Sequence, residues 1–146
     1  MDILNILEKA TQINSVSGSE NEIRKFISDN VKKYCDELSV DAMGNLIAHK
    51  KGSGKKIMFA AHMDEIGIIV TDIDDKGFVR FSSVGGLNLR NLVNLRVRFA
   101  NGIEGVIGAE EESFKDKPAI SKLYVDLGAA DKKEAEKIVS IGDAAS

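Results

Sequence analysis

The chain has 146 residues, with 20 Lys and Arg against 23 Asp and Glu, which gives a formal net charge of −3. A hydrophobic fraction of 43% with a single proline predicts a folded chain of one domain, or two small ones, and argues against disorder along its whole length. The mild acidity and the absence of a basic tract argue against nucleic acid and against an anionic membrane surface as partners.

The cysteine count and the chain start bear on the cell compartment. Cys35 is the only cysteine, which excludes an internal disulfide, and Met1-Asp2 is not followed by the basic and apolar segments of a signal peptide. The longest apolar runs, 57–61 and 66–70, are much shorter than the roughly 20 residues needed to cross a bilayer. We therefore expect a soluble, cytoplasmic protein.

Two helices are predicted first. Apolar residues recur at helical spacing over 3–13, and Asp2 is the expected N-cap. A second helix is predicted from a capping box of Ser19 and Glu22 onwards, with apolar residues at helical spacing up to Tyr34.

Short strands are predicted next. The segments 38–40 and 46–48 flank a turn at 41–45, which indicates a hairpin, and the polar loop 50–56 leads into an apolar run over 57–61 that favours a buried strand. Met58 and Met63 are expected to fill core space. Helices followed by short strands favour an α/β layer.

The sequence pattern changes after residue 65, where short β-rich runs follow one another with turns between them. Such spacing is typical of a small barrel or sandwich. The predicted strands are 66–73, 78–82, 95–99, 105–107 and 122–126, the turns are 74–77 and 101–102, and Asp131 with Glu134 can cap a helix through Val139. We predict two units, residues 1–65 and 66–146. The acidic run 110–112 is interpreted as a solvated loop.

One stretch, Ala61-His62-Met63-Asp64-Glu65, carries candidate chemistry. It lies where the predicted strand 57–61 ends, and ligands bind at the carboxyl ends of strands in α/β sheets. Residues two apart in an extended segment point to the same side, so His62 and Asp64 can face one pocket. A neutral imidazole binds a divalent metal through one nitrogen while a carboxylate fixes its tautomer through the other. By itself the pattern is weak, because a lone histidine at a strand end is more often a hydrogen-bonded structural residue. His49, beside two lysines, is assigned no role.

Several segments in order resemble the glutamyl aminopeptidase and tetrahedral aminopeptidase family, whose members have also been labelled cellulase M or endoglucanase. They are Ser17-Gly18 with Glu20, Asp41-Ala42-Met43-Gly44-Asn45-Leu46, Ala61-His62-Met63-Asp64-Glu65-Ile66-Gly67, Gly85-Gly86, Gly105-Val106-Ile107-Gly108, and Asp126-Leu127-Gly128-Ala129 with Glu134-Ala135.

The resemblance implies the N-terminal portion of a co-catalytic metallopeptidase α/β domain, joined to a β-rich, barrel-like insertion domain used in assembly. It implies a peptide hydrolase in which two divalent ions, zinc or cobalt, activate a bridging water for attack on the first peptide bond. Carried over by position, His62 resembles the first metal ligand and Asp64 the catalytic carboxylate that supports it.

The chain also departs from the family. The remaining metal ligands and the general-base glutamate lie beyond residue 146 in the family, and one imidazole is too few for a catalytic zinc, which needs three protein ligands. We therefore expect no tightly held metal and no activity from this chain alone. The alternative is a non-catalytic oligomerisation or binding module. An incomplete barrel would expose unpaired strand edges, so self-association, or pairing with the missing C-terminal part, is expected in both cases.

Overall fold

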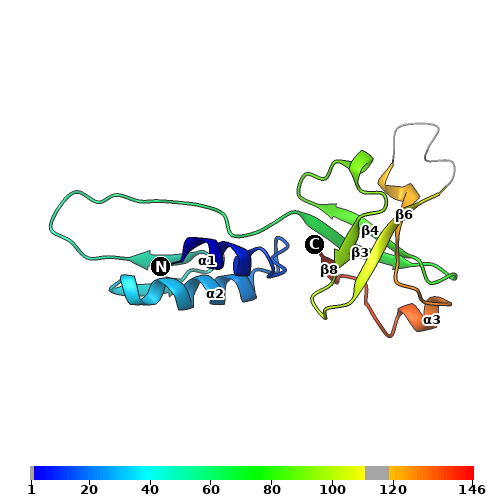
Figure 1. Ribbon diagram of the computed structural model, residues 1–146, viewed down its shortest axis with the longest axis horizontal. Helices are drawn as coiled ribbons and strands as arrows, with labels where there is room; N and C mark the ends of the chain where they lie inside the picture. Colours follow the sequence, from blue (N-terminus) through cyan, green and yellow to red (C-terminus); the bar gives the residue numbers. More distant parts are fainter. Residues whose placement is uncertain (1, 111–118) are drawn as a thin grey trace.

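A computed structural model describes residues 2–110 and 119–146. Within them, two helices and a hairpin come first in the chain, and an antiparallel sheet with a short helix follows (Figure 1). No described helix is long and apolar enough to span a membrane.

The first two helices are where the apolar spacing predicts them, with corrections at their ends. Helix α1 covers Ile3–Ala10, and the Asp2 side chain caps it by accepting from the Asn5 amide at 3.3 Å. Helix α2 covers Asn21–Val31 and continues as the 3-10 turn η1 over Lys32–Tyr34. The predicted capping box is wrong: Ser19 lies in the turn before the helix, where its amide bonds to the Val16 carbonyl, and the N-cap residue Glu20 makes no side-chain cap.

The predicted hairpin is confirmed. Strand β1 covers Glu37–Val40, β2 covers Leu46–His49, and the two pair antiparallel. The Asp41 carboxylate fixes the turn by accepting from the Met43 and Asn45 amides at 2.9 Å each. This local bonding also lowers the pKa of the Asp41 carboxyl, with the Asn45 side chain as the largest cause.

The predicted buried strand over 57–61 is wrong for this chain. No strand assigned in the described residues pairs with this run, and Ile57, Met58 and Phe59 are 78, 86 and 94% exposed. An apolar run becomes a buried strand only where neighbouring strands take up its backbone hydrogen bonds and a second layer covers its side chains. The expectation that Met58 fills core space is therefore wrong as well, whereas Met63 is half-buried.

The second part of the chain forms a six-stranded antiparallel sheet in the order β5-β6-β7-β4-β3-β8. The strands are β3 Gly67–Ile73, β4 Val79–Val84, β5 Arg96–Arg98, β6 Glu104–Ala109, β7 Leu123–Asp126 and β8 Ala144–Ala145. The 3-10 turns η2 Leu89–Asn91 and η4 Ile120–Lys122 lie between strands. The predicted strands and turns of this part are confirmed to within a few residues.

The two outer strands of the sheet meet. Phe99, just after β5, forms a bridge with Ala145 of β8, and the backbones of Arg98 and Ser146 exchange hydrogen bonds at 2.7 and 3.2 Å. The sheet is therefore a nearly closed barrel, and the expectation of unpaired edges at these strands is wrong. Closure depends on residues 144–146, whose short apolar run carried no strand pattern.

Helix α3, Lys132–Ala135, is shorter than predicted. The Asp131 cap is confirmed, since its side chain accepts from the Glu134 amide at 2.9 Å, but the helix ends at Ala135 instead of reaching Val139. A turn follows that places Val139 in the barrel core at 2% exposure. The C-terminal end of α3 therefore follows from the burial of Val139 in the barrel and not from the helical spacing of the apolar residues.

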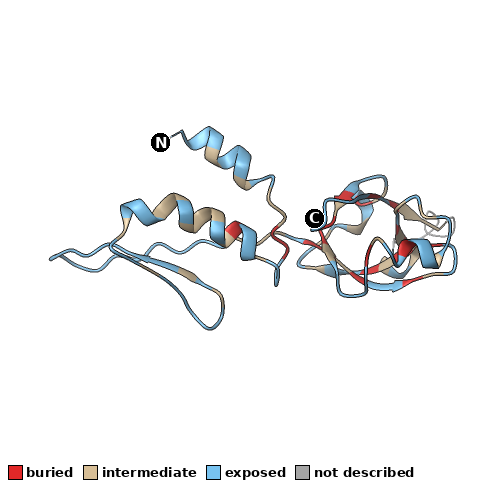
Figure 2. Ribbon diagram, turned by 90° about the horizontal axis from the view of Figure 1, so that it is seen from below, coloured by how far each residue is buried: buried red, intermediate tan, exposed pale blue. Residues whose placement is uncertain are grey.

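The core lies almost wholly in the barrel. Of the hydrophobic residues buried in the described parts of the chain, all but Val16 and Ile23 belong to one cluster inside the sheet (Figure 2). Helix α1 buries no residue, and Ile3, Leu4 and Leu7 on it are largely exposed. The described chain thus has one complete hydrophobic core, in the barrel, and a helical layer whose apolar side chains are largely uncovered.

Glu110, the only described member of the acidic run 110–112, is not simply solvated. Its carboxylate pairs with Arg80 at 2.9 Å and Lys122 at 3.1 Å, and Arg80 also pairs with Asp74. The other two glutamates lie outside the described residues. The interpretation of this run as a solvated loop therefore misses the two ion pairs of Glu110, with Arg80 and with Lys122.

Candidate functional site

The segment that carries His62 is fixed at one end. Glu65 lies beside Val16 in a parallel bridge, its amide donates to the Ser15 carbonyl at 2.9 Å, and its carboxylate accepts from the Ser15 amide at 2.9 Å. Ser15 and Val16 are buried, so this junction is one of the few buried contacts of the described first part of the chain. It holds residues 64 and 65 against the stretch before α2.

His62 and Asp64 are in direct contact. The imidazole Nδ1 lies 3.1 Å from Oδ1 of Asp64 and 2.9 Å from the Asp64 backbone oxygen. An ionised carboxylate and a carbonyl can only accept, so the neutral ring must carry its proton on Nδ1. Its Nε2 then holds a free lone pair, and the side chain is 86% exposed. The two residues therefore form the imidazole and carboxylate pair that the sequence pattern predicts.

Ser17 is the residue that sequence reasoning missed. Its hydroxyl donates to Oδ2 of Asp64 at 2.5 Å, so the two oxygens of this carboxylate have different partners, Ser17 and His62. The hydrogen bond from Ser17 is the largest cause that lowers the pKa of the Asp64 carboxyl, and the contact with His62 adds to it. No spacing rule connects positions 47 residues apart; only the quoted Ser17-Gly18 motif drew attention to this stretch.

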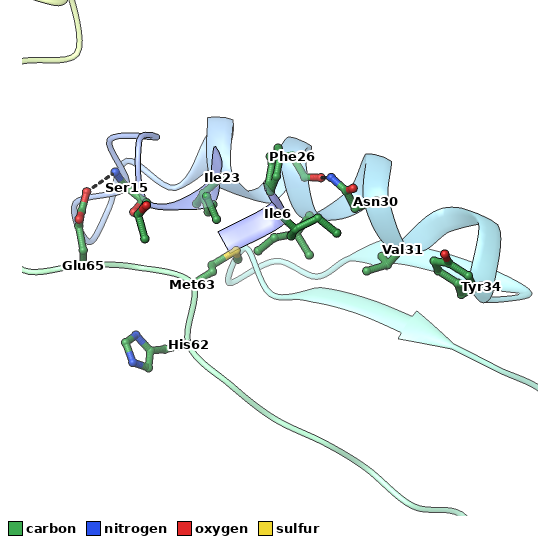
Figure 3. A pocket seen from close by; sticks show the side chains of 13 residues that line it. Ile6, Ser15, Ile23, Phe26, Asn30, Val31, Tyr34, His62, Met63 and Glu65 are labelled. Atoms are coloured by element: carbon green, nitrogen blue, oxygen red, sulfur yellow. Dashed lines mark hydrogen bonds between the residues drawn. The ribbon is translucent and has the colours of Figure 1, made fainter. Parts of the chain in front are cut away.

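A cavity of about 480 Å³ lies beside this segment, between α1 and α2. Most of its lining is aliphatic or aromatic, from both helices, with Met63 and His62 on the other side: Ile6, Ala10, Thr11, Ser15, Ile23, Phe26, Ile27, Asn30, Val31, Tyr34, His62, Met63 and Glu65. In Figure 3 the Met63 side chain extends towards the helices, while the His62 ring lies on the opposite side of the backbone. The Asn30 amide donates to the Phe26 carbonyl. Because its lining is mainly apolar, the cavity is more typical of a hydrophobic surface that lacks a covering layer than of a site where a reaction takes place.

Within residues 2–110 and 119–146, no group of three or more His, Cys, Asp or Glu side chains is placed to hold a metal ion. His62 and Asp64 supply one nitrogen and one supporting carboxylate. His49 lies on the hairpin, where its Nδ1 is 3.0 Å from Oε2 of Glu37. It is not near His62 in sequence or in strand pairing, and nothing in its contacts gives it a chemical role.

Comparison with known proteins places these residues in context. The sequence model described as M42 glutamyl aminopeptidase matches residues 44–146. An Acetivibrio thermocellus protein described as a candidate aminopeptidase is 53% identical over 146 residues, which cover 99% of this chain and 44% of that protein. The lysyl aminopeptidase of Pyrococcus furiosus is 36% identical over 144 residues, covering 91% of this chain and 42% of the enzyme.

The fold has solved counterparts. The structure of the TET1 peptidase of Pyrococcus horikoshii matches with a TM-score of 0.84 at 38% identity, covering 99% of this chain and 46% of that one. That peptidase can assemble into a tetrahedron or a large octahedral shell. The predicted α/β fold with a barrel-like sheet is confirmed. The chain spans less than half the length of the relatives it matches.

Proposed function

Because the chain belongs to the M42 glutamyl aminopeptidase family, we propose that it is the N-terminal part of a dinuclear metal-dependent aminopeptidase, which removes N-terminal residues from peptides. The observation that carries the proposal is the His62 imidazole, with Nδ1 bonded to Asp64 and Nε2 open to solvent. That arrangement leaves the lone pair available for a metal ion while the carboxylate fixes the ring.

The residues present fit one ligand position of a metal site and no more. An imidazole nitrogen suits zinc or cobalt, but a catalytic zinc takes three protein ligands. In the complete enzyme, two divalent ions would lower the pKa of a bound water and polarise the peptide carbonyl. His62 would supply one nitrogen, and Asp64 would keep the imidazole proton on Nδ1. We expect the chain alone to bind metal weakly and to be inactive.

The exposed apolar surface of the first part supports the same proposal. Residues 57–59 lie outside regular secondary structure, pair with no described strand and are largely exposed, and they lead directly to His62. The cavity between α1 and α2 is lined mainly by apolar side chains. We propose that residues 1–65 are part of the catalytic α/β domain, and that the polypeptide which completes the family length covers these faces and pairs with 57–61. An exposed patch of this kind marks an interaction surface.

Residues 66–146 would then form the insertion domain used in assembly. Assembly into a homo-oligomer is proposed from the behaviour of the Pyrococcus horikoshii relative. Since β5 and β8 meet through Phe99 and Ala145, contacts between subunits would use side chains rather than these strand edges.

Fragment complementation tests the proposal. The chain is mixed with the C-terminal part of the Acetivibrio thermocellus relative, taken from the residue that follows the matched segment, and zinc or cobalt is added. We expect no hydrolysis of aminoacyl p-nitroanilides by either part alone and hydrolysis by the mixture. His62→Ala should abolish it, and the matched control His49→Ala should not. Hydrolysis by the isolated chain that His62→Ala abolishes would contradict the claim of an incomplete site.

A non-catalytic assembly module is the second candidate, because the barrel holds nearly all of the buried hydrophobic residues. Light scattering after size exclusion separates the two. An oligomer of the chain that never gains activity with the C-terminal part favours the module, whereas an active mixture excludes it.

A further inference from the structure

The Ser17 hydroxyl lies where it can control the orientation of Asp64. We propose that Ser17 is a positioning residue, whose hydroxyl holds the Asp64 carboxylate so that His62 keeps its proton on Nδ1 and its lone pair on Nε2. The inference rests on the proposed function, because it explains how the metal-facing nitrogen is prepared before any metal binds.

Apart from the Asp64 backbone oxygen, which lies 2.9 Å from Nδ1 of His62, the described contacts offer the His62 and Asp64 pair little support. The two residues are two positions apart in a stretch without regular secondary structure, and their side chains are 86 and 37% exposed. Two exposed groups outside regular secondary structure form a weak contact, because water competes for both. The carboxylate needs a second anchor, and the hydrogen bond from Ser17 to Oδ2 at 2.5 Å is the anchor that the described contacts provide.

Ser17 itself is well placed to act as that anchor. Its amide donates to the Glu65 carbonyl at 3.3 Å, and its neighbour Val16 is fully buried. Val16 also packs where a Cβ on Gly67 would lie, at 2.6 Å, so the anchoring stretch is tied to the start of the barrel. Ser17 lies 47 residues before Asp64 in the chain, so its hydroxyl joins the Asp64 carboxylate to a separate, anchored segment.

The Ser17 hydroxyl makes no other hydrogen bond among the described contacts. Serines just before a helix are common N-caps, but the N-cap residue of α2 is Glu20, and Ser17 donates to no group of that helix. Its side chain is exposed, so packing does not explain it either. The bond to Asp64 accounts for its orientation.

The tautomer of His62 is the readout, measured on the metal-free full chain. Long-range proton–nitrogen NMR correlations at about pH 8.5, where imidazoles are neutral, give the ratio of the Nδ1–H and Nε2–H forms. The chain has two histidines, so His49→Gln assigns the signals, and His49 in each sample is an internal control. We expect mainly the Nδ1–H form at His62 in the unaltered chain.

Three variants distinguish the hydroxyl from the backbone around it. Ser17→Ala should shift the His62 tautomer ratio towards Nε2–H by about threefold, the size expected for one lost hydrogen bond. Ser17→Thr retains the hydroxyl and should restore the ratio. Ser19→Ala removes a hydroxyl two residues away that has no described bond to Asp64, and it should change nothing.

Each result decides the proposal. An unchanged ratio in Ser17→Ala overturns it, and so does an equal shift in Ser17→Thr or Ser19→Ala, which would mark a general disturbance of the loop. Backbone amide spectra confirm that each variant is folded. Because no metal, substrate or C-terminal part is present, a negative result here leaves the complementation test of the proposed function unaffected.

Discussion

Residues 2–65 and 66–146 have comparable supplies of apolar side chains but use them differently. In the barrel they close a core around Ile68, Val79 and Leu123, which are at most 2% exposed. In the first part, among the described residues, only Val16 and Ile23 are buried hydrophobics, while Leu4 and Phe59 are 77 and 94% exposed. Hydrophobicity alone therefore does not build a core, because each apolar face needs a second layer to cover it.

Hydrogen exchange is expected to show the largest difference between the two parts. Amides of β3, β4 and β7 should exchange only on global opening, whereas those of α1, with no buried residue, should exchange through local fraying. We expect the α1 amides to exchange at least about a thousandfold faster. Exchange measured by NMR or mass spectrometry checks this, and equal protection in both parts would mean that the helices are covered in solution.

Core truncation should follow the same division. Leu123 in β7 is fully buried, so Leu123→Ala should lower the free energy of unfolding by about 3 kcal/mol. The matched change Leu4→Ala on the exposed face of α1 should cost less than about 0.5 kcal/mol. Urea unfolding followed by circular dichroism compares them, and similar losses would contradict the idea of one finished core.

The junction between the two parts is tested at Gly67. A Cβ there would lie 2.5 Å from the Ala145 carbonyl oxygen and 2.6 Å from Val16, so Gly67→Ala forces the barrel start and the Val16 stretch apart. We expect a loss of about 2 kcal/mol. Gly86→Ala is the matched control, because a Cβ at that position meets no atom within 4 Å. If both glycines tolerate alanine equally in thermal unfolding, the junction is looser than the structure indicates.

The smallest expected effect on stability comes from the ion pairs of Glu110. The pairs with Lys122 and Arg80 hold the pKa of the Glu110 carboxyl below its ordinary value. A lowered folded-state pKa means that the carboxylate stabilises the fold above the ordinary glutamate pKa, and that this contribution is lost as the pH falls through the folded-state pKa.

Glu110→Gln should therefore flatten the fall of Tm between neutral and acid pH without removing it, and Glu8→Gln, at an exposed position on α1, should leave the curve unchanged. Differential scanning calorimetry across that pH range makes the comparison. A steeper acid limb in Glu110→Gln would contradict the sign.

Elements that depend on interactions between residues close in the sequence could be predicted. The hairpin depends on Asp41 bonding to its own neighbours, and the turns at 74–77 and 101–102 depend on short polar and glycine sequences. The conformation of 57–61 was not predictable, because the same apolar run becomes a buried strand or stays exposed and unpaired according to what lies beside it. The short strand over 144–145 was missed for the converse reason, since its pairing alone makes it a strand.

The candidate site divides in the same manner. His62 and Asp64 are two residues apart, so the alternation of an extended segment was enough to predict that they meet. Ser17 could not be predicted, because its contact with Asp64 depends on the parallel bridge between Val16 and Glu65.

The sequence by itself determined the family, the first two helices, the barrel strands other than β8 and the pair of His62 with Asp64, since each depends on local pattern or on a motif of consecutive residues. Only the tertiary structure decided that the barrel edges meet through Phe99 and Ala145, that 57–59 is uncovered and that Ser17 reaches Asp64. The reason is physical: such contacts join segments distant in the chain, and their energies depend on which surfaces are brought together.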